Sequence, residues 1–500
     1  MKVVVFEHPR IASYEKFNDI ANTPLWSCLM GGYVAAGLQA KGAEVIYLDH
    51  AKPGCGFETS LARLLSLSPD LLAVNAVYFW EHTEKLFEFF TTIRELGFSG
   101  HLNLFGFFPS LVYSEILRVR PAIDSVAVGE CEHTITALWE TLRMNGLPRT
   151  VAGLATRDKE NTIHYRARPV EKKPDLFPFP LRSETTDPTV TILASRGCYN
   201  RCSFCLIPPF DDQHGGWRGR SPKNIAEEIR GYKKKGYATF YFSDPNFIGP
   251  GKQGQERTLQ LLEMLEELDI TYGMETRPND LDDEMMKALV DSGLTSLLMG
   301  VESGSASQLR HLSKHSSAET ASAAISLCRK YGIDPEIGFL MFLPDGDLDD
   351  LKENFSFLQQ NRLLTRLDRT ANLLCHRQLV LRGSAGYENY LQSGRLTATG
   401  MFGFEGIVSF RDPMMEAICE VVLCACHTVL REMMNKNSPV YWQNPIPACC
   451  DSLNNLLIGV FTRKLETGGE IDRGREKELI SKEISAIIHS HRKRAQSLRG

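Results

Sequence analysis

Three cysteines, Cys198, Cys202 and Cys205, are spaced as C-x3-C-x2-C within one short stretch of the chain. Thiolates on such a loop suit a 4Fe-4S cluster and leave its fourth iron without a protein ligand. An open iron can bind a small chelating ligand and pass it one electron, which a fully cysteine-ligated electron carrier cannot do. The spacing therefore predicts a catalytic cluster in which these three residues are the metal ligands.

Two other interpretations of the loop remain open: a structural zinc site with no evident fourth ligand, and unrelated core thiols. Zinc sites usually pair cysteines in two C-x2-C knuckles or with histidines at fixed spacing. The thirty residues that follow Cys205 hold no such pattern, and His214 is the only nearby candidate ligand.

The residues around the cysteines resemble the signature of the radical S-adenosylmethionine (radical SAM) superfamily. Residues 189–194 read as a short buried strand, which is followed by Ser195-Arg196-Gly197 and then by Cys198. Phe204 precedes the last cysteine, as that family prefers. The resemblance implies a 4Fe-4S cluster, SAM as cofactor, and Phe204 among the cofactor-binding residues.

Strand and helix patterns alternate from residue 189 to residue 343. This alternation predicts right-handed crossovers and a parallel sheet. Six such units would form the partial barrel that is typical of radical SAM enzymes. The cluster loop would then follow the first barrel strand, at the carboxyl-end face where barrel active sites lie.

The resemblance also implies where SAM binds. The peptide 300–305 is similar to the family segment that contacts the ribose and amino-acid portions of SAM, with Glu302 and Ser303 as cofactor-binding residues. A helix-capping role for Glu302 is the alternative. Glu275 and Arg277 end the preceding strand pattern at the same face and are further candidates. The family's glycine-glycine-glutamate is replaced by the peptide 243–246, Ser-Asp-Pro-Asn.

The first 148 residues follow a strand-helix pattern that predicts a complete doubly wound domain, whose ligand would lie outside the carboxyl ends of the strands. The first strand pattern ends in Glu7-His8-Pro9-Arg10, so no G-x-G-x-x-G phosphate loop follows it. The absence of this motif argues against a bound dinucleotide.

This order of motifs resembles the cobalamin-binding domain that precedes many radical SAM barrels. The resemblance implies that two loops cradle the corrin ring and its nucleotide tail. Their cofactor-binding residues would be Phe107, Phe108, Pro109 and Ser110 in the first loop, and Gly129, Glu130 and Thr134 in the second.

No D-x-H-x-x-G motif occurs within residues 1–150. A base-off cobalamin, methylcobalamin in a methyltransferase, is therefore implied. Its lower face would lie against Val77, Tyr78 or Phe79, and we expect Tyr78 to be the contact. Phe107 and Phe108 replace the commoner glycine-glycine-x-histidine loop and offer apolar packing surfaces. A degenerate domain that no longer binds cobalamin is the alternative.

These patterns predict an α/β protein with four segments. They are a Rossmann-like cobalamin-binding domain (1–148), a hairpin and proline-rich linker (149–188), a partial (β/α)6 radical SAM barrel (189–400) and a mostly helical C-terminal domain (401–500). Proline at this density predicts an extended linker. Five cysteines between Cys419 and Cys450 predict core packing, with an auxiliary cluster as the alternative.

A net charge of −5 gives no reason to expect nucleic acid, because nucleic-acid binders are usually basic. Met1-Lys2 leads straight into a strand pattern and not into a signal peptide. No apolar run reaches the length expected of a membrane span. Unpaired thiols beside an oxygen-sensitive cluster predict a reducing cytoplasm. The expected partners are a small-molecule substrate and an electron donor such as flavodoxin or ferredoxin.

The mechanism implied by the resemblance starts with reductive cleavage of SAM to methionine and a 5'-deoxyadenosyl radical, which removes a hydrogen atom from the substrate. Methylcobalamin then supplies a methyl group, and a second SAM restores it. We therefore expect a cobalamin-dependent methyltransferase acting on an unactivated carbon, or on phosphorus, of a small molecule. Cyclisation or rearrangement, as in porphyrin-type ring closure, is the alternative within this architecture. A non-catalytic cobalamin or redox sensor is the alternative from another class.

Overall fold

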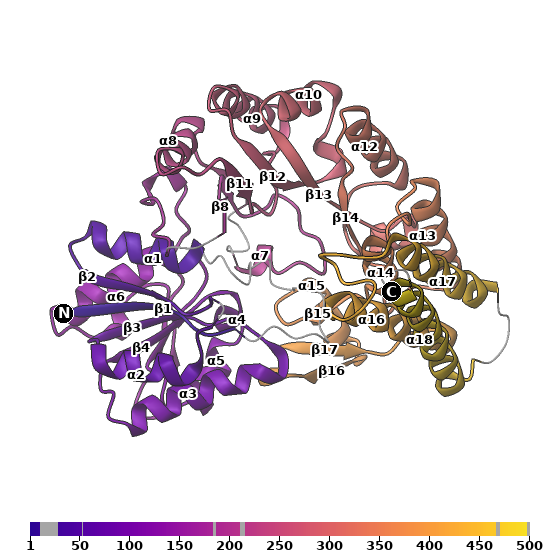
Figure 1. Ribbon diagram of the computed structural model, residues 1–500. Helices are drawn as coiled ribbons and strands as arrows, with labels where there is room; N and C mark the ends of the chain where they lie inside the picture. The colour runs from indigo at the N-terminus through magenta and orange to yellow at the C-terminus, as the bar shows by residue number, and fades with distance from the viewer. Residues whose placement is uncertain (11–28, 53, 184–186, 211–215, 467–470, 498–500) are drawn as a thin grey trace.

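The computed structural model describes residues 1–10, 29–52, 54–183, 187–210, 216–466 and 471–497 (Figure 1). His214 and Cys28 lie outside the described residues. An N-terminal sheet with its helices occupies one side of the molecule, and a second parallel sheet and a group of C-terminal helices occupy the other (Figure 1). The predicted α/β class with parallel sheets is confirmed.

The first sheet has the strand order β2-β1-β3-β4-β5-β6-β7. Its five parallel strands are β1 (Lys2–Glu7), β2 (Glu44–Asp49), β3 (Leu71–Asn75), β4 (His101–Phe105) and β5 (Ser125–Ala127). The order 2-1-3-4-5 is a doubly wound arrangement, which places ligands at the carboxyl ends of the strands. The doubly wound prediction for this region therefore agrees with the observed topology.

Helices cover both faces of this sheet. On one face, α1 (Leu29–Ala40) and α6 (Glu132–Arg143) pack against the side chains of Val3 and Val5. On the other, α2 (Phe57–Leu67), α3 (Thr83–Glu95) and α5 (Tyr113–Val119) pack against Val4 and Phe6. Because both faces are covered, the central strands are apolar at almost every position.

The hairpin predicted within 149–188 joins the first sheet. Its strands β6 (Leu154–Arg157) and β7 (Ile163–His164) run antiparallel and extend the sheet beyond β5. Leu154 and Ala155 are buried there. The hairpin covers the edge of β5, whose backbone groups would otherwise lack partners.

The second sheet has the order β14-β13-β12-β11-β8, and all its strands are parallel. The strands are β8 (Thr189–Ile192), β11 (Thr239–Phe242), β12 (Thr271–Thr276), β13 (Leu294–Glu302) and β14 (Glu336–Phe339). The helices that alternate with them are α8 (Pro222–Lys233), α9 (Gly251–Glu266), α10 (Asp283–Asp291), α12 (Ala318–Lys330) and α13 (Leu348–Gln360).

The expected six-unit barrel differs from this sheet, which has five strands in the described part of the chain. At the sixth position the chain forms only a single parallel bridge, between Phe342 and Arg377, after α14 (Leu367–Cys375). The following strand β15 (Val380–Leu381) then pairs with β17 (Glu405–Val408) and not with the barrel sheet. Pairing with this antiparallel partner diverts the sixth strand from the barrel.

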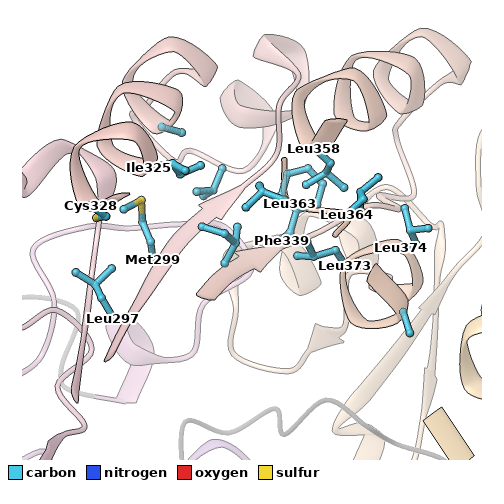
Figure 2. Close-up of a cluster of buried hydrophobic side chains, with 14 of the residues drawn as sticks. Leu297, Met299, Ile325, Cys328, Phe339, Leu358, Leu363, Leu364, Leu373 and Leu374 are labelled. Carbon is cyan, nitrogen blue, oxygen red and sulfur yellow. The ribbon is translucent and has the colours of Figure 1, made fainter. Parts of the chain in front are cut away.

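The barrel core continues into the C-terminal helices α16 (Pro413–Met434), α17 (Pro447–Glu466) and α18 (Arg473–Ser497). Figure 2 shows part of it, where Met299 and Phe339 of the sheet point toward side chains of α12 and α13. The same cluster includes Val422, Leu453 and Ile484 of the last three helices. The predicted boundary at residue 400 falls between the paired strands β16 (Leu396–Thr399) and β17.

The C-terminal cysteines Cys419, Cys426 and Cys449 are buried in this core together with Cys375. No cluster of metal-ligating side chains occurs among the described residues of this region. By length and composition alone, α16 could cross a bilayer. This finding corrects the expectation that no apolar run would reach the length of a membrane span. However, 56% of its apolar window is buried, as in a core helix.

Candidate active site

The cluster cysteines lie on a loop at the carboxyl end of β8. The short strand β9 (Ser195–Arg196) pairs with β10 (Arg218–Gly219), and Gly197 then turns the chain with φ +73° into the first cysteine. Within the loop, Ser203 N donates to Leu312 O at 2.9 Å, and Ser203 O accepts from Gly386 N at 2.7 Å. The loop is therefore held between the end of α11 (Ala306–His311) and the start of α15 (Ala385–Gln392).

Backbone amides donate to two of the thiol sulfurs. Asn200 N lies 3.5 Å from Cys198 Sγ, and Ile207 N lies 3.4 Å from Cys205 Sγ. Burial raises the pKa of all three cysteine thiols, that of Cys205 to about 12. Iron binds the thiolate, so these amide donors stabilise the form that the cluster requires. Lys314 acts in the same direction, since its charge lowers the pKa of each thiol.

The three thiols do not converge on one point. Over the described part of the chain, no three His, Cys, Asp or Glu side chains are placed to hold a single metal ion. Ligands of a 4Fe-4S cube bind different iron atoms and so stand apart from one another. The donor set and the amide hydrogen bonds fit a cluster.

Glu302 ends β13 beside the cluster loop, as predicted. Its Oε1 lies 2.8 Å from Lys314 Nζ; the Lys314 side chain is buried, and 12% of the Glu302 side chain is exposed. Glu302 has φ +70°, an uncommon conformation for a residue other than glycine. The helix-capping alternative fails, because the N-cap of α11 is Ser305 and Glu302 pairs with Lys314 instead. Lys314 is a site residue that sequence reasoning missed.

Ser303 is fully buried, and its Oγ lies 2.7 Å from Asn354 Oδ1. The same Oδ1 accepts from Gly304 N at 2.7 Å. Ser303 therefore stabilises the turn after β13, and its predicted contact with SAM stays a prediction. Phe204 is half-buried within the loop.

Glu275 lies near the end of the neighbouring strand β12, and Arg277 directly follows that strand. Burial raises the pKa of Glu275 to about 7, and the Tyr241 hydroxyl donates to its Oε1 at 3.1 Å. The guanidinium of Arg277 lies 5.3 Å from the centre of the Tyr199 ring and donates to Lys314 O at 3.2 Å. Arg277 thus joins the cluster loop to the segment that carries Lys314.

A polar network that the sequence did not reveal holds the outer side of the loop. The Tyr199 hydroxyl donates to Asp280, with 2.6 Å between the oxygens, and Asn246 Nδ2 donates to the Tyr199 oxygen at 2.9 Å. Asp244 accepts from Ala194 N at 3.0 Å and from the Ser195 hydroxyl at 2.5 Å. Burial raises the pKa of Asp244 to about 6. Asp244 and Asn246 of the 243–246 peptide therefore hold the cluster loop in place.

The loop after β4 in the first domain contacts the segment that follows the cluster cysteines. Phe107, at the start of α4 (Phe107–Leu111), stacks on Phe210, which ends α7 (Ile207–Phe210), with ring centres 3.9 Å apart. Figure 1 shows α7 between the first domain and the barrel. Ser110 is buried, and its Oγ accepts from Gly129 N at 2.9 Å, which joins the two predicted cobalamin loops. Pro109 is buried within α4.

Tyr78 and Phe108 contact the segment between β16 and β17. The Tyr78 ring lies 4.7 Å from that of Phe404, and its hydroxyl donates to Glu405. The Phe108 and Phe404 ring centres are 5.0 Å apart. The structure therefore brings Tyr78, the predicted contact of the lower face of cobalamin, and Phe108, a predicted corrin contact, next to the start of β17.

Glu130 of the first domain forms an ion pair with a residue of β10 and a hydrogen bond with the linker. Its Oε2 lies 2.9 Å from Arg218 Nη1, and its Oε1 accepts from Glu171 N at 2.8 Å. Thr134 is fully buried, where its Oγ1 accepts from Arg168 Nε at 3.1 Å. These contacts are structural, and a role for Glu130 and Thr134 in binding cobalamin stays a prediction.

His8, directly after β1, is not available as a cobalt ligand. Its Nε2 accepts from Val77 N at 3.1 Å, and its Nδ1 donates to Pro9 O at 2.8 Å. Burial lowers its pKa to about 3, so the ring is neutral. Both ring nitrogens of His8 are thus engaged in hydrogen bonds.

Residues 192–358 match the sequence model of the radical SAM superfamily. The chain carries a radical SAM domain. Such a domain implies a 4Fe-4S cluster and SAM, and the three cysteines fall within the matched range. A radical SAM domain also identifies the chain as an enzyme.

Several relatives cover different shares of the chain. An uncharacterised methyltransferase of Pyrococcus horikoshii is 23% identical over 72% of this chain and 78% of its own length. An anaerobic magnesium-protoporphyrin IX monomethyl ester cyclase of Synechocystis is 29% identical over 46% of this chain. A bacteriochlorophyllide d C-8(2)-methyltransferase of Chlorobaculum tepidum is 29% identical over 42%. The matches span about half the length of the latter two relatives, 47% and 46%.

Two solved structures share the fold over nearly the whole chain. The cobalamin-dependent SAM radical enzyme OxsB, with aqua-cobalamin and SAM bound, aligns with a TM-score of 0.75 at 19% identity over 99% of this chain and 80% of that one. The radical SAM methyltransferase TsrM of Kitasatospora setae, with cobalamin and a 4Fe-4S cluster bound, gives 0.67 at 14% identity over 96% and 99%. At this identity the likeness shows the fold alone.

Proposed function

We propose that this protein is a cobalamin-dependent radical SAM methyltransferase that acts on an unactivated carbon, or on phosphorus, of a small molecule. The observation that carries the proposal is the contact between Phe107 and Phe210, with ring centres 3.9 Å apart. It places the carboxyl-end loops of the doubly wound domain against the helix that follows the cluster cysteines. A ligand of the first domain would therefore lie next to the cluster loop.

When bound, the cluster, SAM and cobalamin supply one-electron reduction, a carbon radical and a transferable methyl group. The protein's own residues bind and orient them. Cys198, Cys202 and Cys205 would hold the cluster. Glu302 and Lys314, 2.8 Å apart at the end of β13, offer an acceptor and a donor to the polar groups of SAM.

The loops 106–110 and 128–134 would hold cobalamin. The neutral, hydrogen-bonded His8 supports the base-off form. The aromatic side chains of Tyr78 and Phe108 supply a buried apolar wall there. Such a wall would exclude water from a cofactor held by these loops. The names of the Pyrococcus horikoshii and Chlorobaculum tepidum relatives support methyl transfer.

Cyclisation of a porphyrin-type substrate is the second candidate, because a relative with that activity in its name is 29% identical over 241 residues. The product mass distinguishes the two reactions. Methyl transfer adds one carbon and two hydrogens, whereas cyclisation adds no carbon. A non-catalytic sensor would need no SAM site, and the buried Glu302 and Lys314 pair beside the cysteines argues against it.

The enzyme would work in a reducing compartment together with a separate electron donor. The buried unpaired thiols support a reducing cytoplasm as its compartment. A small electron donor of the flavodoxin or ferredoxin type would reduce the cluster. Residues 1–148 would act as the cobalamin-binding domain and residues 189–400 as the radical SAM unit.

Anaerobic loading with iron, sulfide and hydroxocobalamin, followed by gel filtration and metal analysis, tests the proposal. One cobalt per chain is expected beside a 4Fe-4S cluster. Cys202→Ala should lose the iron and keep the cobalt, since the proposed cobalamin loops belong to the other domain. Iron without cobalt in the unmodified protein would leave a radical SAM enzyme and overturn the cobalamin part.

A further inference from the structure

A cavity of about 530 Å3 lies between the three-stranded sheet β15-β17-β16 and helix α16. Its volume is in the range of small-molecule sites. Apolar side chains form much of its wall, and they come from the sheet, from α16 and from the first domain. These residues are Trp80, Leu379, Val380, Leu381, Ile407, Val408 and Leu423.

Two arginines, Arg377 and Arg431, line the same cavity. Arg377 Nη2 donates to Val408 O at 2.9 Å, and its guanidinium lies 4.7 Å from the centre of the Phe410 ring. Arg431 is exposed at the rim. Within the described ranges, neither arginine forms an ion pair with a carboxylate. The one lining carboxylate, Glu405, already accepts from the Tyr78 hydroxyl. The cavity therefore has an excess of positive charge.

Gln378 adds a neutral polar group to the cavity wall. Its side chain is buried, with 4% of the residue exposed, and its Oε1 has no hydrogen-bond partner among the described residues. The backbone N–H of Gln378 already has a partner, because it donates to Phe342 O at 2.9 Å. A buried amide without a partner costs free energy. A ligand in the cavity would supply the missing partner.

The cavity also adjoins the support of the cluster loop. A β-carbon at Gly386 would lie 3.7 Å from Gln378 Nε2, and Gly386 N donates to Ser203 O between the second and third cysteines. Trp80 of the first domain also lines the cavity. So does Glu405, which accepts a hydrogen bond from the Tyr78 hydroxyl. The cavity thus lies where the first domain, the barrel and the C-terminal segment meet.

We propose that this cavity binds a small organic anion, with an apolar body against the sheet and a carboxylate or phosphate group facing Arg377 and Arg431. Arginine binds both groups through paired donors. Gln378 Oε1 would accept a hydrogen bond from an N–H or O–H group elsewhere on the same molecule. The identification of this anion as the substrate rests on the function proposed above, whereas the binding itself needs neither cobalamin nor turnover.

Binding of three probes to the full-length, cluster-loaded protein tests the site. They are 3-phenylpropionate, phenyl phosphate and the neutral ester methyl 3-phenylpropionate, which adds no hydrogen-bond donor, and binding is measured by calorimetry. At least one anion should bind at least about tenfold more tightly than the ester, which corresponds to about 1.4 kcal/mol. The tighter anion shows whether the site selects carboxylate or phosphate. Equal binding of all three probes, or no binding of either anion, would overturn the proposal.

Arg377→Gln and Arg431→Gln should each weaken binding of the anion, whereas the matched control Arg475→Gln, exposed on α18, should not. Arg431 is exposed, so its variant tests the site even if Arg377→Gln fails to fold. Unchanged binding in Arg431→Gln would contradict the proposal. Displacement of the bound anion by hydroxocobalamin would also overturn it, because the cavity would then be part of the corrin site. Iron and cobalt contents of the same preparation report separately on the proposed function.

Discussion

Arg218 Nη1 lies 2.9 Å from Glu130 Oε2, and both side chains are almost fully buried where the first domain meets the cluster loop. Arg218 belongs to β10, which pairs with β9 directly before the cysteines. Glu130 follows β5, at the carboxyl end of the first sheet. This buried ion pair, together with those that Arg196 forms with Glu130 and Glu132, joins the predicted cobalamin loop to the predicted cluster loop.

Glu130→Gln should destabilise the protein by about 3–5 kcal/mol, because it leaves the guanidinium of Arg218 buried without its full counter-charge. Urea unfolding of the unmodified and variant proteins measures the change. Glu160→Gln, which removes an exposed carboxylate from the hairpin turn, is the control and should change stability little. Equal stability of both variants would show that this pair does not hold the interface.

Lys314 and Glu302 form a second buried pair, with 2.8 Å between Nζ and Oε1. Lys314→Met should cost about 3–5 kcal/mol, because it leaves the Glu302 carboxylate buried and unpaired. The double variant Lys314→Met with Glu302→Leu should lose less than the sum of the two single changes. The coupling expected in this double-mutant cycle of urea unfolding is about 0.5–3 kcal/mol. Strictly additive losses would mean that the two groups do not interact.

Glu275 predicts a pH dependence of stability. Burial raises its pKa from an ordinary 4.5 to about 7. The folded protein therefore holds a proton that the unfolded chain has lost between these pH values, so the contribution of Glu275 to stability falls as pH rises from 4.5 to 7. Above pH 7 the ionised carboxylate is destabilising, by at most about 3 kcal/mol at 1.36 kcal/mol per pKa unit.

Glu275→Gln should therefore stabilise the cofactor-free protein at pH 8 and have little effect near pH 4.5. Urea unfolding at both pH values gives the comparison, and Glu263→Gln on the exposed face of α9 is the control. A gain that is the same at both pH values would show that Glu275 has an ordinary pKa.

Local patterns were sufficient to propose the three cysteines as cluster ligands and to predict most of the strands. Cys198, Cys202 and Cys205 lie within eight residues of one another, so their proximity needs no knowledge of the fold. The apolar strands of the two parallel sheets are visible for the same reason, because burial on both faces leaves a continuous apolar run.

The contacts made across long distances in the chain could not be predicted in this way. Lys314 meets Glu302 only because α11 returns the chain to the end of β13. Glu130 meets Arg218, and Tyr78 meets Glu405, through the packing of separate segments. The sequence patterns also did not show that the sixth position of the barrel sheet would form only one parallel bridge, between Phe342 and Arg377, in the described part of the chain. Each outcome depends on tertiary packing, which a single sequence pattern does not encode.

The most direct test of the central claim is release of 5'-deoxyadenosine from SAM by the anaerobically loaded protein under dithionite. Cys202→Ala removes a cluster ligand, and Cys424→Ala removes a half-buried thiol of α16 as a matched control. We predict release by the unmodified protein and by Cys424→Ala, and none by Cys202→Ala. Release that survives in Cys202→Ala, or that is absent from an unmodified protein with a reduced cluster, would contradict the account.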